Sequence, residues 1–208
     1  MNLRSFPEEK KKRLEDLRCK LELARGISAE DLALQIRQIG FECKRCGECC
    51  TGEDNSVVVF PFEIRRILTA TEELWQEIVE SPSEGEWDIS GNFHTLEWRL
   101  KKEKGSCKFY SCEECKCYES RPLICKTYPF YLDDGILCFS ECQGLGAKIC
   151  IKESEEIAVK LIERNVTEII ESIAVLEKYE DFERGRPSIN GACIVHDSDG
   201  EHRIPLGQ

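Results

Sequence analysis

The sequence predicts an α+β fold, mostly helical, with short antiparallel strands around a cysteine-rich metal-binding centre. Three observations lead to this expectation. Apolar residues recur at helical spacing near both ends of the chain, in residues 7–25 and 153–183. Short runs of strand-forming or alternating residues lie between them. All but three of the 14 cysteines fall within residues 43–50 and 107–142.

Two predicted helices open the chain. Leu14, Leu17 and Leu21 share one face of a charged helix over residues 7–25. Ser28, followed three residues later by an acidic side chain, marks the start of a second helix that ends at Gly40. We expect both helices to cover the cysteine-rich part of the chain.

The sequence of residues 56–101 predicts short strands and helices. Residues 56–60 form an apolar strand, Pro61 opens a helix through Thr69, and a second helix spans 71–80. Residues 81–92 have the composition of a loop. The alternation in 93–101 predicts a strand with one face made of four residues: His94, Leu96, Trp98 and Leu100.

The second half of the sequence predicts a hairpin, an irregular segment, a long helix and a C-terminal hairpin. Residues 107–110 pair in a hairpin with the preceding strand, and the segment from there to Gly146 is irregular. Residues 153–183 form an amphipathic helix whose apolar stripe packs inward. The stripe consists of Ile162, Val166, Ile169, Ile173 and Leu176. The tail, 192–206, forms a hairpin that turns at Asp197 to Gly200.

These elements suggest three parts. We expect N-terminal helices in 1–40, a cysteine-cluster metal-binding domain in 41–146, and, in 147–208, a long helix and a C-terminal hairpin that pack on it.

Composition narrows the possible partners. The chain has 208 residues and a formal net charge of -11, which disfavours binding to a nucleic-acid backbone. No apolar run is long enough to suggest a membrane span, and the start of the chain lacks the apolar core of a signal peptide. We therefore expect a cytoplasmic protein with no nucleic-acid or membrane partner.

The cysteines are predicted to be metal ligands. In a reducing compartment, a dense set of cysteines is not expected to form disulfides. Cys43, Cys46 and Cys49 are separated by two residues each, as in the ferredoxin run that binds a cubane iron–sulfur cluster with a distant fourth ligand. A closed zinc site with four cysteine ligands also fits this spacing.

Cys50 directly follows this run. In an extended segment, adjacent α-carbons lie about 3.8 Å apart and their side chains point to opposite sides. Cys49 and Cys50 are then expected to serve two adjacent sites, or different parts of one larger cluster. The alternative is that Cys50 is a small buried hydrophobic residue.

The second cysteine stretch carries a resemblance to a known family. Cys107 precedes Phe109 and Tyr110, and Cys142 precedes Gly144 and Gly146. The central motif comprises Cys115, Tyr118, Arg121, Pro122 and Cys125. Together with the first run, this pattern resembles the CxxCxxCC cysteine-cluster family, a zinc- or iron-chelating domain related to flagellin lysine methylases. The resemblance covers about residues 41–146.

The resemblance implies eight metal ligands, which divide into two sets of four. They are Cys43, Cys46, Cys49, Cys50, Cys107, Cys115, Cys125 and Cys142. This chain departs from the family pattern at Cys117, Lys126 and Tyr128, and Cys112 and Cys138 are additional. The extra thiols leave open a larger cluster or a redox-active thiol pair. Cys19, Cys150 and Cys193 are expected to be structural.

Arg121 is the predicted cofactor-binding residue outside the cysteines. Ser120 is expected to cap a helical turn that contains Pro122 and presents Cys125. Arg121 then lies close enough to offset the negative charge of the thiolates. The alternative is an ordinary surface ion pair. The three histidines are expected to be core or surface residues rather than ligands.

Three functions remain open at this point. The first is a metal-binding protein with one or two cysteine-ligated iron–sulfur clusters, of [4Fe–4S] type, that serves electron transfer or assists a protein partner. The second is a zinc-stabilised interaction module. The third, by analogy with the methylase relatives, is an enzyme that modifies protein lysines, but no catalytic residue is identified.

Overall fold

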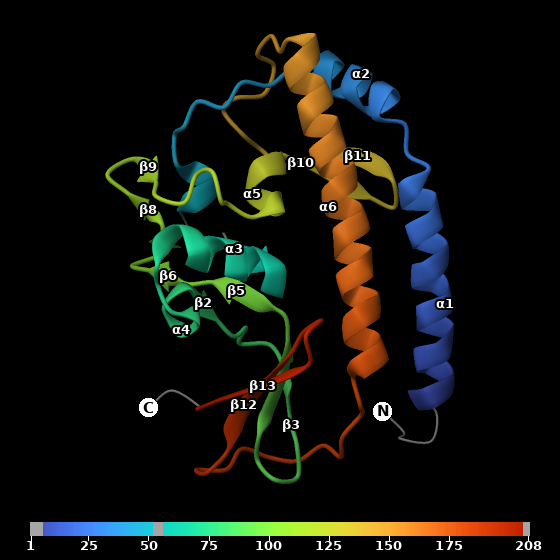
Figure 1. The fold of residues 1–208 in the computed structure, drawn as a ribbon, viewed down its shortest axis with the longest axis vertical. Coiled ribbons are helices and arrows are strands. Elements are labelled where there is room, and N and C mark those ends of the chain that lie inside the picture. Colours follow the sequence, from blue (N-terminus) through green and yellow to red (C-terminus); the bar gives the residue numbers. More distant parts are fainter. Residues whose placement is uncertain (1–5, 52–55, 206–208) are drawn as a thin grey trace. The chain divides into compact units, whose positions relative to one another are not determined.

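The computed structural model describes residues 6–51 and 56–205. The chain forms two compact units, and each is described by itself (Figure 1). The sheet unit comprises Met1–Arg18, Val58–Lys101 and Ile170–Gln208, and the cysteine unit comprises Cys19–Val57 and Lys102–Ile169. Two of the four boundaries between the units fall within helices, at Arg18 in α1 (Phe6–Arg25) and at Ile169 in α6 (Ile151–Lys178). The three-part division expected from the sequence stays a prediction.

A four-stranded sheet, ordered β13-β12-β4-β3, organises the sheet unit. Strands β12 (Ala192–His196) and β13 (Glu201–Pro205) form the predicted C-terminal hairpin, which is confirmed. Strand β12 also pairs in parallel with β4 (Phe93–Leu96), which pairs antiparallel with β3 (Glu86–Trp87). Every residue of β12 is buried, so this strand forms the centre of the unit.

The alternating segment 93–101 is not one strand with one apolar face, as the sequence suggested. Glu97 has a φ of 62°, and this left-handed residue separates β4 from β5 (Trp98–Leu100). Strand β5 enters a second sheet, where it lies between β1 (Val58–Val59) and β2 (Val79–Glu80), and its residues Trp98 and Leu100 are buried. Leu96, expected on the same face, is 52% exposed. The break occurs because a left-handed residue cannot continue a pleated strand.

The predicted helix 71–80 is also wrong. Helix α3 (Pro61–Thr71) opens at the predicted proline and ends at Glu72, whose φ is 57°. Only a short helix, α4 (Trp75–Ile78), follows, and the chain then enters β2 (Val79–Glu80) beside β5. The predicted strand 56–60 is reduced to β1 (Val58–Val59), and the predicted loop 81–92 contains β3.

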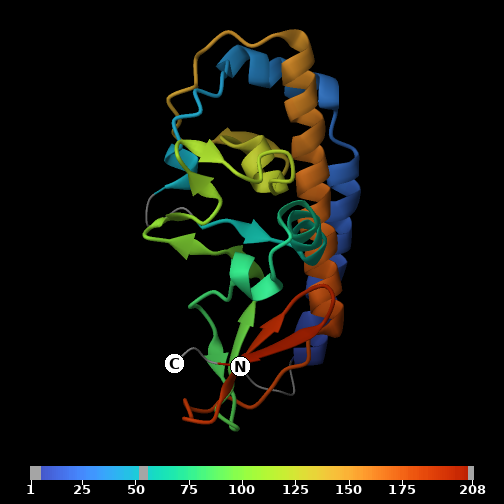
Figure 2. The same ribbon diagram turned by 60° about the vertical axis from the view of Figure 1, so that its left-hand side comes forward.

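Within the sheet unit, the part of α1 up to Arg18 lies alongside the end of α6, from Ile170 onward (Figures 1 and 2). Lys10 donates hydrogen bonds to two backbone carbonyls at the end of α6, and Arg18 pairs with Glu177 at 3.0 Å. The polar contacts fix the register of the two helices.

The hydrophobic core of the cysteine unit lies between α2 (Ala29–Ile39) and the first half of α6. Helix α2 begins at the predicted N-cap, where the Ser28 hydroxyl accepts a hydrogen bond from the Asp31 amide, and it ends at Gly40. Its buried residues pack with Ala158 and Leu161 of α6, while the expected stripe residue Ile162 is only partly buried. The core consists of Leu32, Ala33, Ile36, Phe130, Ile149, Ala158 and Leu161.

Regular structure is sparse in the cysteine-rich segment. The hairpin of β6 (Lys102–Glu103) with β7 (Ser106–Cys107) and that of β8 (Tyr110–Ser111) with β9 (Glu114–Cys115) have ladders of only two residues (Figure 2). Helix α5 (Leu123–Thr127) follows. Strands β10 (Phe130–Asp133) and β11 (Ile136–Phe139) then form a longer hairpin, with Phe130 in the core.

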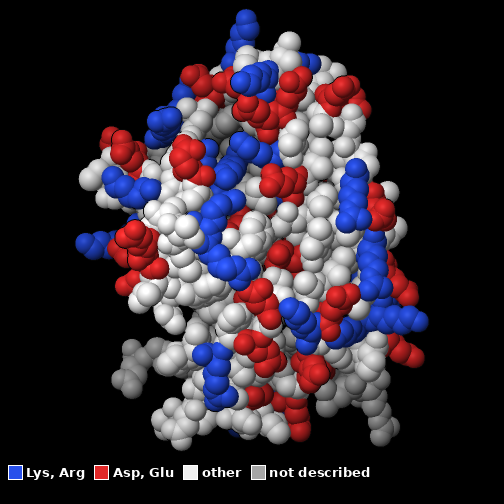
Figure 3. Space-filling model, in the orientation of Figure 1, with Lys and Arg blue, Asp and Glu red and all other residues white. Residues whose placement is uncertain are grey.

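No helix within the described residues combines the length and apolar character needed to cross a bilayer. Acidic and basic side chains are intermixed on the face drawn in Figure 3. The net negative charge is therefore not confined to one patch of that face.

Candidate metal centre

All 14 cysteines lie among the described residues, and all are free thiols. The eight predicted ligands belong to the cysteine unit, although their positions span residues 43–142 of the chain. They are half-buried or exposed, as ligands near a surface centre would be. The donors required by the sequence prediction are therefore present in one compact unit as free thiols.

The first cysteine run forms a tight turn around Gly47. Gly47 has a φ of 78° and precedes a 3-10 turn, η1 (Glu48–Cys50). A Cβ atom at Gly47 would lie 1.8 Å from the Tyr110 hydroxyl oxygen, so only glycine fits both the backbone conformation and the space. The turn therefore holds Cys46, Cys49 and Cys50 close together.

Backbone contacts bring the start of this run to the distant Cys142. Phe41 bridges Leu145, and the Glu42 amide donates to the Gly144 carbonyl at 3.0 Å. The Gly144 amide in turn contacts the Cys142 sulfur at 3.4 Å. These contacts place Cys142 beside the first run.

The electrostatics of Cys142 identify its neighbours. Burial raises the pKa of the Cys142 thiol, and the hydrogen bond from the Gly144 amide lowers it. The nearby charges of Cys46, Cys43 and Cys49 raise this pKa further. Coulomb interactions between thiolates fall with distance, so these thiols lie near one another. We call them the first thiol group: Cys43, Cys46, Cys49 and Cys142.

A second group of thiols surrounds Cys50. Thr51 bridges Ser106, which brings the end of the first run beside Cys107. Burial raises the pKa of Cys125, and the charges of Cys107, Cys49 and Cys115 raise it further. The pKa of Cys50 is raised by its contact with Cys49, by burial and by the charges of Cys107 and Cys125. We call Cys50, Cys107, Cys115 and Cys125 the second thiol group, and Cys49 of the first group adjoins it.

The two groups meet at Cys49 and Cys50, but not as the sequence predicted. These residues lie in the η1 turn rather than in an extended segment, and their sulfur atoms are 3.9 Å apart. The pKa of Cys49 is lowered to about 7, and the largest cause is the hydrogen bond from the Cys50 thiol. The expectation that adjacent side chains point to opposite sides is therefore wrong, because a 3-10 turn places them about a third of a turn apart.

Cys117, an additional thiol in the sequence prediction, lies beside the second thiol group. It is buried, and its sulfur lies 3.8 Å from that of Cys115. This contact is the main cause that lowers the pKa of Cys115 to about 6. The Cys-x-Cys spacing was the available signal. Cys117 can replace Cys115 as a ligand or support it as a hydrogen-bond donor.

Arg121 lies close to the second thiol group. Its guanidinium carbon stacks 3.6 Å from the ring centre of Tyr118, and that of Arg45 lies 5.3 Å from the same ring. The positive charge of Arg121 acts to lower the pKa values of Cys49, Cys115 and Cys125. Burial acts in the opposite direction and raises all three. Tyr118 was not predicted to have this role, and it provides the platform for both arginines.

The predicted cap of α5 is wrong. The Ser120 hydroxyl donates to the Cys117 carbonyl at 3.2 Å instead of capping the helix, and Pro122 occupies the N-cap position. The expected result still holds, because α5 carries Cys125 beside the other thiols. Ser120 instead stabilises the turn that contains Cys117.

The remaining cysteines lie outside these groups. Cys112 and Cys150 are exposed, and Cys19 is exposed on α1. Cys138 lies across from Tyr131 in the β10-β11 hairpin, and Cys193 is buried in strand β12. Cys193 packs in the sheet unit, where a small apolar side chain fits.

The donor set fits a thiophilic metal. Within residues 6–51 and 56–205, no group of three or more His, Cys, Asp or Glu side chains is arranged to hold a metal ion as the structure stands. Two sulfur pairs are nevertheless 3.9 and 3.8 Å apart. Thiolates on one tetrahedral zinc, with Zn–S bonds of about 2.3 Å, lie about 3.8 Å apart. Free thiols at this spacing suit zinc or iron rather than hard cations such as Mg²⁺.

Comparison with known proteins identifies one family. Residues 42–150 match the model of the CxxCxxCC family, described as "Putative zinc- or iron-chelating domain". No curated protein and no solved structure gives a significant match. The matched segment contains both thiol groups and Arg121.

Proposed function

Since the chain belongs to the CxxCxxCC family of zinc- or iron-chelating domains, we propose that it is a metal-binding protein that carries two adjacent cysteine-ligated iron–sulfur clusters. The first thiol group would hold one cluster and the second thiol group the other. A bound [4Fe–4S] cluster supplies one-electron transfer. The cytoplasmic role that we propose is electron transfer to, or redox support of, a protein partner.

One observation carries this proposal. Thiols from three stretches that are distant in the sequence act on one another electrostatically inside one unit, with Cys49 acting on thiols of both groups. We propose that they divide into two sets of four. Each set combines residues of the first run with later cysteines, as a cluster with one distant ligand requires. The tight turn at Gly47 supports this arrangement, because it lets the run fold around a single core.

Arg121 has a defined part in this proposal. Its charge favours the thiolate forms of Cys49, Cys115 and Cys125, which are the forms that bind metal. The Tyr118 ring holds the guanidinium in place. We propose that Arg121 offsets the negative charge of the second cluster, which raises its reduction potential.

The test is metal analysis of the full-length protein purified without oxygen. Wild-type protein is expected to contain iron and acid-labile sulfide. Cys142→Ser should lose the cluster of the first thiol group, and Cys125→Ser that of the second. Each variant should retain about half of the wild-type iron, and Cys19→Ser, an exposed thiol outside both groups, should retain all of it.

Two results would contradict the proposal. If either Cys142→Ser or Cys125→Ser alone removes all of the iron while the protein stays folded, the thiols form one centre. Wild-type protein that contains zinc in stoichiometric amounts and no sulfide has no iron–sulfur cluster.

The second candidate is a zinc-stabilised interaction module. The sulfur pairs Cys49–Cys50 and Cys115–Cys117 already have the spacing of two thiolates on one zinc ion. In that arrangement Cys49 and Cys50 would share a metal, and the metal would only stabilise the fold. Replacing Cys117 with serine separates the candidates, because it should lower zinc content but leave the iron content of the four-plus-four arrangement unchanged.

A further inference from the structure

The sheet unit contains a chain of polar side chains that the metal centre does not use. The Asp88 carboxylate contacts His94 Nε2 at 3.1 Å, and His94 Nδ1 contacts His196 Nε2 at 2.9 Å. On its other side, His196 Nδ1 faces the Glu201 carboxylate at 3.5 Å. The side chain of His196 is 4% exposed, whereas that of Glu201 is 62% exposed. The chain therefore runs from the interior to the surface.

Aromatic packing fixes both imidazole rings. Phe182 stacks on His94 with a centroid distance of 3.9 Å, and the Tyr179 ring meets His196 edge-on at 4.9 Å. The two imidazoles are themselves stacked, with centroids 5.2 Å apart. Neither ring is free to turn over without disturbing this packing.

The direction of the hydrogen bonds follows from Asp88. Burial opposes ionisation of Asp88, but hydrogen bonds from Asn92 and His94 lower its pKa to about 2, so the carboxylate can only accept. With neutral rings, His94 Nε2 must then donate to Asp88, and His94 Nδ1 must accept from His196 Nε2. His196 Nδ1 is left with a lone pair that faces the Glu201 carboxylate. Two acceptors thus face each other with no proton between them.

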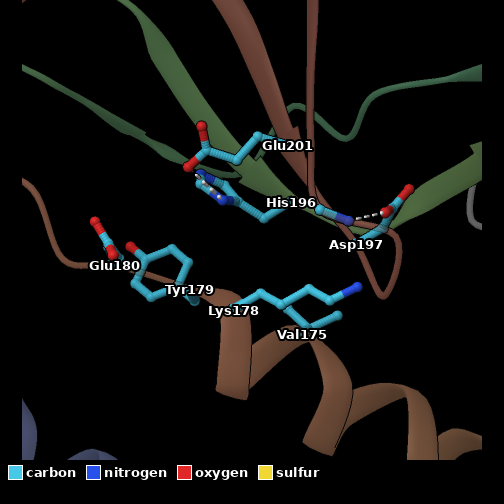
Figure 4. A pocket seen from close by; sticks show the side chains of 8 residues that line it. Val175, Lys178, Tyr179, Glu180, His196, Asp197 and Glu201 are labelled. Atoms are coloured by element: carbon cyan, nitrogen blue, oxygen red, sulfur yellow. Dashed lines mark hydrogen bonds and ion pairs between the residues drawn. The ribbon is translucent and has the colours of Figure 1, made fainter.

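This acceptor pair lies in the wall of a pocket of about 280 Å³ (Figure 4). Figure 4 shows Glu201 and His196 on one side and Tyr179, Lys178 and Val175 on the other. The remaining lining residues are Glu180, Asp197 and Gly200. The pocket thus combines acceptors, an aromatic ring and an aliphatic side chain.

Two other charged groups of the pocket, Asp197 and Lys178, already make hydrogen bonds. The Asp197 carboxylate accepts from Trp98 Nε1 at 2.7 Å, from His202 and from the backbone of its own turn. The Lys178 ammonium group donates a hydrogen bond to the Ser198 carbonyl at that turn. The groups that remain to meet a ligand are therefore the His196 lone pair and the carboxylates of Glu201 and Glu180.

We propose that this pocket binds a protonated primary amine. The ammonium group would donate hydrogen bonds to His196 Nδ1 and to the Glu201 carboxylate, where each acceptor lacks a donor. Its alkyl chain would pack on Tyr179 and Val175. A cation with three N–H donors matches a site made of convergent acceptors, and an aromatic wall adds a cation–π attraction.

The test uses the full-length protein labelled with ¹⁵N at histidine, at about pH 8, above the usual titration range of histidine. The probe is n-butylammonium chloride. Tetramethylammonium chloride is the control, because it carries the same charge but has no N–H donor. We expect butylammonium to cause a saturable shift of the His196 Nδ1 resonance toward that of a hydrogen-bonded nitrogen, and tetramethylammonium to cause none.

Two variants locate the site. Glu201→Gln replaces the exposed acceptor with a neutral amide and should weaken butylammonium binding about tenfold, as expected for the loss of one charge-assisted hydrogen bond. Glu9→Gln makes the same charge change on the exposed surface of α1, and it should leave the affinity unchanged.

Several outcomes would overturn the proposal. One is a free protein whose His196 Nδ1 already carries a proton, because the proton would then occupy the ligand position. Equal shifts with both cations would show a general effect of charge. A missing or non-saturable shift, or an affinity unaffected by Glu201→Gln, would show that the pocket does not take the amine.

Discussion

The two units of this chain are ordered by different means. The sheet unit contains a four-stranded sheet whose central strand β12 is buried throughout, and buried polar groups pair with one another along it. The cysteine unit has its hydrophobic core between α2 and α6, while residues 102–115 form only two-residue ladders. Side-chain packing therefore explains the sheet unit, whereas the cysteine-rich hairpins require another source of order. We expect bound metal to be that source, because the thiols can supply its ligands.

Removing the metal is expected to cause the largest difference between the two units. Chelation under anaerobic conditions should abolish amide protection in the hairpins of β6 to β9 and leave that of β12 intact, because only the former depend on ligand bonds. Hydrogen exchange followed residue by residue measures both regions in one sample. Unchanged protection in β6 to β9 would show that these hairpins are stable without metal.

The core of the cysteine unit offers the next largest effect. Leu161→Ala should lower the free energy of unfolding by about 2–5 kcal/mol, because it leaves a cavity between α6 and α2. Denaturant titration of the metal-loaded protein measures it. Val159→Ala on the same helix is the control, since Val159 is 56% exposed and its replacement should change stability by no more than about 0.5 kcal/mol. Equal effects of the two substitutions would place the core elsewhere.

Arg121 tests the electrostatics of the second thiol group. Arg121→Gln should weaken metal binding by about 10- to 100-fold, because the thiolates lose a nearby positive charge. A competition titration with a chelator measures the affinity. Arg45→Gln is the matched control, as Arg45 lies farther from the Tyr118 ring, at 5.3 Å rather than 3.6 Å. If both variants lose the same affinity, the effect is one of overall charge.

The smallest predicted effect concerns the pH dependence of the sheet unit. The folded-state pKa of Asp88 is lowered from its ordinary value of 3.8 to about 2. Its ionised form therefore contributes stability above pH 3.8 that is lost as the pH falls toward 2. The stability difference between the wild type and Asp88→Asn, measured by thermal unfolding, should shrink across this window. A difference that stays constant with pH would show that the ionised carboxylate is not stabilising.

Predictions from local patterns were most successful where local physics decides the structure. The Ser28 cap, the Gly40 terminus, the helix opened by Pro61 and the C-terminal hairpin are all confirmed. Each depends on interactions within a few residues. The family match likewise rests on cysteine spacing that the sequence displays directly.

Predictions failed where a single backbone angle or a distant partner decided the outcome. Left-handed conformations at Glu72 and Glu97 ended a helix and divided a strand, and nothing in their side chains marks these positions. Val79 and Glu80 became a strand because β5 offered a hydrogen-bonding edge. Periodicity carries no information about such partners.

By itself, the sequence determined the α+β class and the family, and it predicted which cysteines supply the metal donors. Only the tertiary structure decided which thiols are neighbours: the η1 turn put Cys49 beside Cys50, and bridges from Thr51 and Phe41 brought later cysteines to each. It also brought Asp88 and His94 to His196, which lies about a hundred positions later in the chain. Their hydrogen bonds leave His196 Nδ1 as an acceptor that faces Glu201. The reason is that ligand and hydrogen-bond partners are set by distance and direction in space, which residue spacing fixes only within a single turn.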